Sequence, residues 1–145
     1  MKILYICTGN ACRSLLAEGF TKAFIKRNEL DNIEVKSCGI YANQSYKIPD
    51  IVKQILLKEG IDVSNHISTP VSRKILEESD IIFVMEKTHL LYLKNNFPEI
   101  KNKARLLNKN DIPDPINKPE IEYIKTADKI KATIEKILPE ILMGL

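Results

Sequence analysis

The segment from Lys2 to Ser14 constrains the fold more than any other part of this 145-residue chain. It begins with a continuous apolar run, Ile3–Ile6, which is typical of a strand buried on both faces. A polar stretch follows directly, with the sequence Cys7-Thr8-Gly9-Asn10-Ala11-Cys12-Arg13-Ser14. Apolar residues then recur at helical spacing, at Leu16, Phe20, Ala23 and Phe24. A strand, a tight loop and a helix in this order predict the first unit of an α/β domain with a parallel sheet.

The rest of the chain continues this alternation. Further strands are predicted at Ile33–Lys36, Asp80–Met85 and Ala104–Leu107. Helices are predicted at Pro49–Gly60, Ser72–Glu78, Thr88–Lys94 and from Glu120 onward. The segment Asp111–Pro115 must form a loop, because it contains two prolines. Helices that connect parallel strands cover both faces of the sheet. Since no linker or repeat interrupts the pattern, we expect residues 1–145 to form a single domain.

Charge and composition narrow the possible partners and the compartment. Lys and Arg number 22 and Asp and Glu number 19, so the net charge is only +3, and no run of five like charges occurs. We therefore expect neither a nucleic-acid nor a membrane partner. The three cysteines are an odd number, and the apolar start, Lys2–Cys7, is too short for the core of a signal peptide. Both observations lead us to expect a reducing compartment and a cytoplasmic protein. His66 and His89 lack metal-ligand spacing, and His89 is interpreted as a surface residue of its helix.

The polar stretch after the first strand has the residue types of an anion site with a nucleophile. Gly9 and Asn10 tolerate left-handed backbone conformations, so several N–H groups of the loop can turn toward one anion. The following helix adds free N–H donors, and the planar fork of Arg13 can hold two phosphate oxygens. The same positive field favours the thiolate of Cys7, to which Ser14 can donate a hydrogen bond. A buried structural cysteine is the simpler alternative, but it leaves the other residues unexplained.

Four motifs, in order, resemble those of the low-molecular-weight protein tyrosine phosphatases. They are Cys7–Ser14 followed by Ala17-Glu18, Ser37-Cys38-Gly39 after the second strand, Gly60-Ile61-Asp62 with His66, and Asp114-Pro115. The resemblance implies a three-layer α/β fold with a four-stranded parallel sheet in the order 2-1-3-4. It also implies hydrolysis through a cysteinyl-phosphate intermediate, without a metal or other cofactor. The substrate would be a phosphorylated protein or a small aryl phosphate, and the protein a monomer or weak dimer.

The resemblance also assigns roles to individual residues. Cys7 is the nucleophile, Arg13 holds the phosphate, and Asp114 protonates the leaving group and then activates water. The substrate phosphate is bound by the other loop residues, which are Thr8, Gly9, Asn10, Ala11, Cys12 and Ser14. Ser37 and His66 help to hold the loop in shape. Asp111 is the rival of Asp114 and is expected to cap or solvate its loop. Cys12 is hypothesised to protect Cys7 by a reversible disulfide.

Several positions depart from the pattern of tyrosine phosphatases. Ile116-Asn117 stands where those enzymes carry two aromatic residues, and the chain has no Trp. Tyr41 or Tyr46 is therefore the candidate wall for an aryl ring. Ala11 replaces both the larger aliphatic residue of tyrosine phosphatases and the threonine of the related protein-arginine phosphatases.

We predict phosphotyrosine as the first substrate and phosphoarginine as the alternative. Related arsenate reductases need two further cysteines to carry oxidation away from the nucleophile. The corresponding region, Phe83–Pro98, contains none, so arsenate reduction is disfavoured. A phosphate- or phosphoprotein-binding module without turnover is the non-enzyme alternative, and it would apply if Asp114 does not reach the site.

Overall fold

A four-stranded parallel sheet forms the centre of the molecule. The computed structural model describes residues 1–100 and 102–145. The strands are β1 (Lys2–Cys7), β2 (Glu34–Gly39), β3 (Ile81–Val84) and β4 (Ala104–Leu106). All neighbouring strands run parallel, in the order β2-β1-β3-β4. The predicted order 2-1-3-4 is therefore confirmed, and the buried strand β1 lies between β2 and β3.

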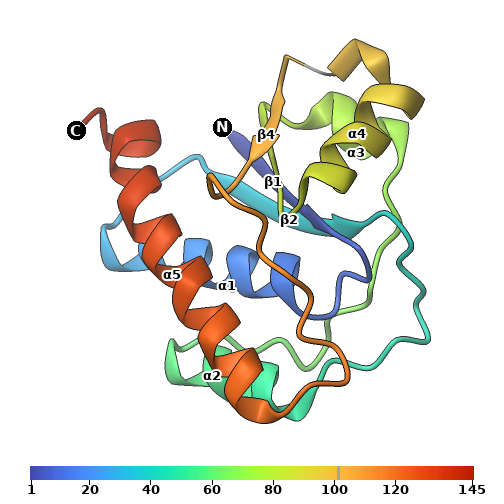
Figure 1. Cartoon of the computed structure of the whole chain (residues 1–145). Helices are drawn as coiled ribbons and strands as arrows, with labels where there is room; N and C mark the ends of the chain where they lie inside the picture. The colour runs from blue at the N-terminus through green and yellow to red at the C-terminus, as the bar shows by residue number, and fades with distance from the viewer. Residues whose placement is uncertain (101) are drawn as a thin grey trace.

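Helices cover both faces of this sheet and complete the three predicted layers (Figure 1). One face carries α1 (Arg13–Arg27), α2 (Asp50–Lys58) and α5 (Glu120–Met143). The other carries α3 (Arg73–Glu78) and α4 (Lys87–Asn96), followed by a 3-10 turn at Pro98–Ile100. Side chains of β1 alternate between the two faces, because successive residues of a strand point to opposite sides. Ile3, Tyr5 and Cys7 belong to the hydrophobic core on the side of α1, α2 and α5. Leu4 and Ile6 belong to the core on the side of α3 and α4.

The predicted elements are all present, with one informative difference in length. The second strand was expected to end at Lys36, before the motif Ser37-Cys38-Gly39. It instead continues through the motif, because Ser37, Cys38 and Gly39 still pair with Tyr5, Ile6 and Cys7 of β1. A Cβ atom on Gly39 would lie 2.6 Å from the carbonyl oxygen of Thr8. Glycine is needed here because the strand passes directly against the polar loop.

The carboxyl ends of the strands place the polar loop at one end of the sheet. Ligands of parallel α/β sheets bind at this end, beside the point where the strand order reverses. β1 leads into the loop and α1 leads out of it, while the segment after β4 returns along the same end toward α5 (Figure 1). Within the described residues, no helix combines the length and the apolar character that crossing a membrane requires.

Candidate active site

The loop between β1 and α1 contains a single left-handed residue. Asn10 has a φ of 57°, whereas Gly9 is not among the residues with positive φ. The expectation that both positions use left-handed backbone was therefore wrong for Gly9. A Cβ atom on Gly9 would lie 3.6 Å from the ring of Tyr46, at ordinary contact distance. Gly9 thus lies beneath an aromatic ring that a Cβ atom would contact without a clash.

Asn10 is fully buried and holds the loop through its side-chain amide, its side-chain oxygen and its backbone carbonyl. Its side-chain amide donates to the hydroxyl of Ser14 (2.8 Å) and to that of Ser37 (2.9 Å). Its side-chain oxygen accepts from the backbone N–H of Thr69 at 2.9 Å. Its backbone carbonyl accepts from the Nε2–H of His66 (2.9 Å) and from the hydroxyl of Ser68, at 3.1 Å. Ser37 and His66, which were predicted to support the loop, therefore both hydrogen-bond to its left-handed residue.

The hydrogen bonds that Asn10 donates determine the direction of a series of hydrogen bonds that ends at the Cys7 sulfur. The Ser37 hydroxyl accepts from Asn10 and lies 2.7 Å from the Glu18 carboxylate, which can only accept. The Ser14 hydroxyl also accepts from Asn10, so its own hydrogen is free to point at the Cys7 sulfur, 3.0 Å away. A hydrogen bond donated to the sulfur favours the thiolate over the thiol. Ser14 is therefore placed to stabilise an anionic nucleophile and an anionic leaving sulfur.

Arg13 is the first residue of α1 and is only 1% exposed. Its Nη1 donates to Glu86 Oε2 at 2.6 Å and to the carbonyl of Ile112 at 2.7 Å. Its Nη2 donates to the Thr8 hydroxyl at 3.2 Å and lies 3.4 Å from Asp114 Oδ2. Because two acceptors occupy both hydrogens of Nη1, the edge formed by Nε and Nη2 is the one able to bind two oxygens of an anion.

Glu86 was missed in the sequence although it fixes the orientation of the arginine. It lies two residues after the end of β3, at the carboxyl end of a strand next to β1. An acidic residue at this position is a recognisable signal, because the carboxyl ends of neighbouring parallel strands meet at one edge of the sheet.

The two candidate acids lie in different surroundings. Asp114 lines the pocket above Cys7 and approaches the Arg13 guanidinium, with its side chain 35% exposed. Asp111 instead accepts a hydrogen bond of 2.9 Å from the backbone N–H of Lys87, the first residue of α4. Asp111 was expected to cap or solvate its own loop, but it binds the first residue of α4, and of the two acids only Asp114 lines the pocket.

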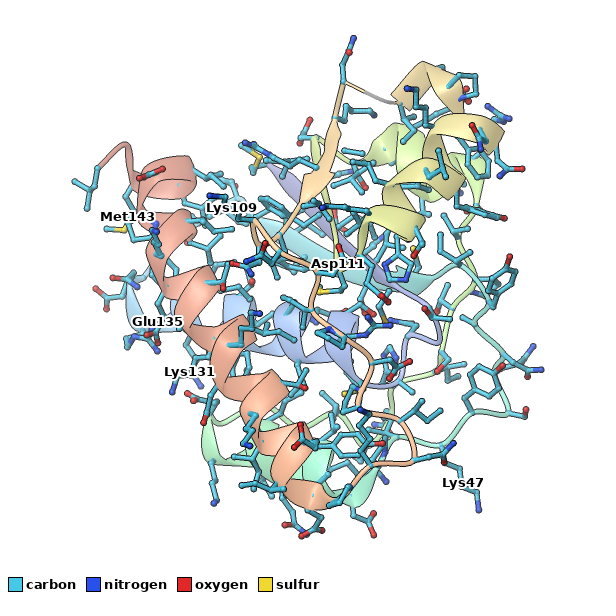
Figure 2. All side chains as sticks on the ribbon, viewed as in Figure 1. Lys47, Lys109, Asp111, Lys131, Glu135 and Met143 are labelled. Atoms are coloured by element: carbon cyan, nitrogen blue, oxygen red, sulfur yellow. The ribbon has the colours of Figure 1, made fainter. Side chains whose placement is uncertain are left out.

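A pocket of about 320 Å³ opens above Cys7. Its floor contains Thr8, Gly9, Ala11, Cys12 and Arg13, and its walls contain Tyr41, Tyr46, Lys47, Pro49, Asp114, Ile116 and Tyr123. Lys47 is exposed and extends outward from the rim (Figure 2). Tyr41 and Tyr46 are 67% and 48% exposed, and the Tyr41 ring contacts that of Tyr92 edge to face. Three tyrosines thus line the pocket, although no aromatic residue follows Asp114-Pro115 directly.

Tyr123 is a pocket residue on the last helix, which was predicted from Glu120 onward without a role in the site. It lies in the first turns of α5, which begins at Glu120 after the loop that carries Asp114. Desolvation and the nearby Cys12 and Asp114 raise its pKa above the ordinary tyrosine value. The Tyr123 hydroxyl therefore stays neutral beside the carboxylate.

His89 is not on the surface, as was predicted, but 4% exposed on the buried side of α4. Its Nε2 lies 2.9 Å from the Thr8 hydroxyl, and its Nδ1 accepts from the backbone N–H of Glu86 at 3.1 Å. Helical spacing did not reveal this burial, because the side chain packs on the polar loop rather than on an apolar core.

The other two cysteines occupy different environments. Cys12 is half-buried and lines the pocket together with Cys7, and both are free thiols. Cys38 is buried in the core on the opposite face of the sheet. Burial is the main cause that raises the pKa of both thiols, and Cys7 raises them further. In the described part of the chain, no cluster of three or more His, Cys, Asp or Glu side chains is arranged to hold a metal ion.

Comparison with known protein families shows which family has a sequence like that of this chain. The model of the family "Low molecular weight phosphotyrosine protein phosphatase" matches residues 2–143. The chain belongs to this family. Low molecular weight phosphatases are protein phosphatases with a cysteine nucleophile, so the chain is assigned to the hydrolases.

Relatives within the low molecular weight phosphatase family carry different activities in their names. The chain is 26% identical over 147 residues to a protein-arginine-phosphatase of Bacillus subtilis (strain 168), a match that covers 97% of each protein. It is 34% identical over 134 residues to arsenate reductase 2 of Staphylococcus haemolyticus (strain JCSC1435), with 92% of each covered. The crystal structure of a low molecular weight protein tyrosine phosphatase from T. tengcongensis superposes with a TM-score of 0.89 at 32% identity, covering 97% of this chain and 99% of that one. These relatives resemble the chain over most of their length, but their names give three different activities.

Proposed function

We propose that this single-domain chain is a protein tyrosine phosphatase that hydrolyses phosphomonoesters through a cysteinyl-phosphate on Cys7. The observation that carries the proposal is the composition of the pocket above Cys7, which is walled by Tyr41, Tyr46 and Tyr123. Aromatic rings favour edge-to-face or offset contacts with one another. An aryl phosphate can therefore place its ring between the tyrosines while its phosphoryl group meets the nucleophile.

In the first step the Cys7 thiolate attacks phosphorus. The S–P bond forms while the bond between phosphorus and the tyrosine oxygen breaks. The Nε–Nη2 edge of Arg13 and the N–H groups of the loop hold the phosphoryl oxygens, where negative charge must be stabilised. Asp114, in the pocket and 3.4 Å from Arg13 Nη2, gives its proton to the departing oxygen, so that a neutral tyrosine leaves.

In the second step the cysteinyl-phosphate is hydrolysed. The Asp114 carboxylate takes a proton from a water molecule, whose oxygen attacks phosphorus. The S–P bond breaks, and the electron pair returns to Cys7 as a thiolate. Ser14, whose oxygen lies 3.0 Å from the sulfur, donates a hydrogen bond to the departing thiolate. Asp114 ends this step protonated and is ready for the next substrate.

Phosphoarginine is the second candidate, and the Asp114 carboxylate favours it. A guanidinium group can pair with this carboxylate and lie against the faces of the tyrosines. A full-length relative is named a protein-arginine-phosphatase. We place phosphoarginine after phosphotyrosine, because Ala11 on the pocket floor has no hydroxyl with which to orient a phosphoramidate or a water molecule.

Arsenate reduction finds less support in the placement of the cysteines. A relay needs thiols that can reach the oxidised nucleophile in turn. Cys38 is paired with Ile6, one residue before Cys7, and belongs to the core on the other face of the sheet. Cys12 is then the one thiol besides Cys7 that lines the pocket.

A panel of phosphopeptides tests the proposal. Phosphate release is measured from matched peptides that carry phosphotyrosine, phosphoarginine or phosphoserine, with Cys7→Ser as the inactive control. We expect phosphotyrosine to be hydrolysed fastest and phosphoserine negligibly, because a short side chain cannot reach the pocket floor. Faster release from phosphoarginine would assign the second candidate. Tight phosphate binding without steady-state turnover of p-nitrophenyl phosphate would show that the protein is a phosphate-binding module and not an enzyme.

A further inference from the structure

A single backbone donor determines which nitrogen of His89 carries the hydrogen. The backbone N–H of Glu86 points at Nδ1 at 3.1 Å. A backbone amide can only donate, so Nδ1 must be the acceptor nitrogen of a neutral ring. In neutral histidine one nitrogen donates and the other accepts. The Nε2 of His89 therefore carries the hydrogen and donates it to the Thr8 hydroxyl oxygen, 2.9 Å away.

The Thr8 hydroxyl receives a second hydrogen bond from Arg13. The guanidinium Nη2 lies 3.2 Å from the same oxygen and has no capacity to accept. His89 and Arg13 thus occupy both acceptor positions of the hydroxyl, and its own hydrogen must point elsewhere. Thr8 lines the pocket above Cys7. A hydroxyl that is held from two sides in this way is a preoriented donor at the pocket floor.

We propose that His89 is a positioning residue of the phosphatase reaction, which holds the Thr8 hydroxyl so that its hydrogen is donated to a phosphoryl oxygen. This role rests on the proposed function of the site and adds a donor to those of Arg13 and the loop N–H groups. Donors that are fixed before the reaction stabilise developing charge without reorganisation. His89 also acts on Arg13, because the Thr8 oxygen that it holds is an acceptor for Nη2.

The groups around the ring keep His89 neutral. Burial and the charge of Arg13 lower its pKa to about 4, although Glu86, Asp111 and Asp114 each act in the opposite direction. Protonation would place a hydrogen on Nδ1, facing the N–H of Glu86. The neutral tautomer is therefore required by the hydrogen bonds and is favoured by the surroundings.

Two substitutions separate the role in the pocket from the role in capping α4. His89→Asn places an amide oxygen near the position of Nδ1, so it can still accept from Glu86 but cannot reach Thr8. His89→Gln places an amide N–H near the position of Nε2 and can still donate to Thr8. We expect His89→Asn to lower kcat for p-nitrophenyl phosphate about tenfold, the equivalent of one ordinary hydrogen bond. His89→Gln should recover most of this loss, although it gives up the bond to the helix terminus.

The opposite order of kcat for the two variants would overturn the proposal, because a residue that only caps α4 is replaced better by Asn. Equal kcat values for both variants and the native protein would also overturn it. Thr8→Val should lower kcat about 100-fold, and Thr8→Ser should retain more activity than Thr8→Val. Thr88→Val, at an exposed position on the same helix as His89, is the matched control.

A double substitution tests whether His89 acts through Thr8. In a Thr8→Val background, His89→Asn should change kcat by less than about twofold, because residues that share one function are not additive. Full additivity would contradict the coupling. The ring ¹⁵N shifts of His89 in the native protein should identify Nε2 as the protonated nitrogen near pH 7. A protonated Nδ1 would refute the assignment even if the variants did not fold.

Failure of the proposed function can be distinguished from failure of this inference. If the native protein does not turn over any phosphomonoester, the function is wrong. Tungstate, an oxyanion of similar shape to phosphate, then serves as the probe in a calorimetric titration. Weaker tungstate binding by His89→Asn than by His89→Gln would support the positioning role. Equal affinities would overturn it.

Discussion

Glu86 and Arg13 form an ion pair in which Oε2 lies 2.6 Å from Nη1, with the arginine almost completely buried and the glutamate side chain 26% exposed. The pair joins the end of β3 to the first residue of α1. A buried guanidinium that loses its partner leaves an uncompensated charge, which is costly. Glu86 therefore decides which edge of Arg13 can meet a phosphoryl group.

We expect Glu86→Gln to impair phosphate binding more than folding. The amide keeps one acceptor for Nη1 but removes the charge that holds the guanidinium in place. kcat/KM for p-nitrophenyl phosphate should fall about 10- to 100-fold, since a charge-assisted hydrogen bond contributes about 1.5–3 kcal/mol. Glu34→Gln, at an exposed position on β2, is the matched control and should retain the native value. An unchanged kcat/KM in Glu86→Gln would mean that Ile112 and Thr8 alone position the arginine.

Asp114→Asn should act mainly on substrates with poor leaving groups. An amide cannot donate the proton that an alkyl or phenyl oxygen needs, whereas nitrophenolate leaves readily without it. We expect kcat for phenyl phosphate to fall about 10²- to 10⁴-fold, with a smaller loss for p-nitrophenyl phosphate. Asp111→Asn retains the oxygen that accepts from Lys87 and should leave both rates nearly native. Equal losses on the two substrates would remove Asp114 from the role of acid.

Asn10 should be the most sensitive position of the loop. Its side chain makes three hydrogen bonds, to Ser14, Ser37 and Thr69. At about 1 kcal/mol each, their loss should lower the free energy of unfolding by about 3 kcal/mol in Asn10→Gly. Asn10→Ala should be about 1 kcal/mol less stable still, because its Cβ is strained at a φ of 57°. Urea denaturation measures both, with Asn96→Ala as a control that removes one exposed bond. Equal stability of the two Asn10 variants would contradict the strain.

Local patterns were sufficient to predict a parallel α/β sheet and the position of the loop, whereas the strand order 2-1-3-4 was implied by the resemblance of four motifs to a known family. A strand, a polar loop and a helix can be recognised from the order of apolar and polar residues in one short segment. Glu86 carried a recognisable signal at the end of a strand, whereas His89 and Tyr123 could not be identified because their roles depend on contacts between distant segments. Tyr123 has the spacing of a core residue of α5, and only the packing of that helix beside the loop brings it to the pocket. His89 lies 81 positions from Thr8 in sequence, a separation that no periodicity can bridge.

Mild oxidation should trap a bond between Cys7 and Cys12. Both thiols line one pocket, and a sulfenic acid condenses with a neighbouring thiol to form a disulfide. Burial raises the pKa of Cys12, so Cys7 should be oxidised first and Cys12 should then attack it. Mass spectrometry after treatment with peroxide is expected to find the Cys7–Cys12 bridge, and Cys12→Ser should accumulate Cys7 sulfonate. Sulfonate on Cys7 of the native protein without any bridge would exclude protection.

Stability should fall in acid through His89. Its pKa is about 4 in the folded protein and near 6.5 in an unfolded chain, so the unfolded state binds the proton more tightly. The stability that depends on the neutral ring is complete above pH 6.5 and is lost as the pH falls from there to about 4. Between pH 7.5 and pH 5 this group should lower the free energy of unfolding by about 2 kcal/mol.

The comparison that isolates His89 is the difference between the native protein and His89→Asn, each unfolded in urea at several pH values. Asn does not titrate, so other ionisable groups contribute equally to both proteins and cancel in the difference. The native protein should lose about 2 kcal/mol more than the variant on going from pH 7.5 to pH 5. Parallel pH profiles would show that the ring can be protonated in place, which the N–H of Glu86 facing Nδ1 at 3.1 Å opposes. A loss confined to the native protein would instead tie the neutral tautomer to the stability of the loop.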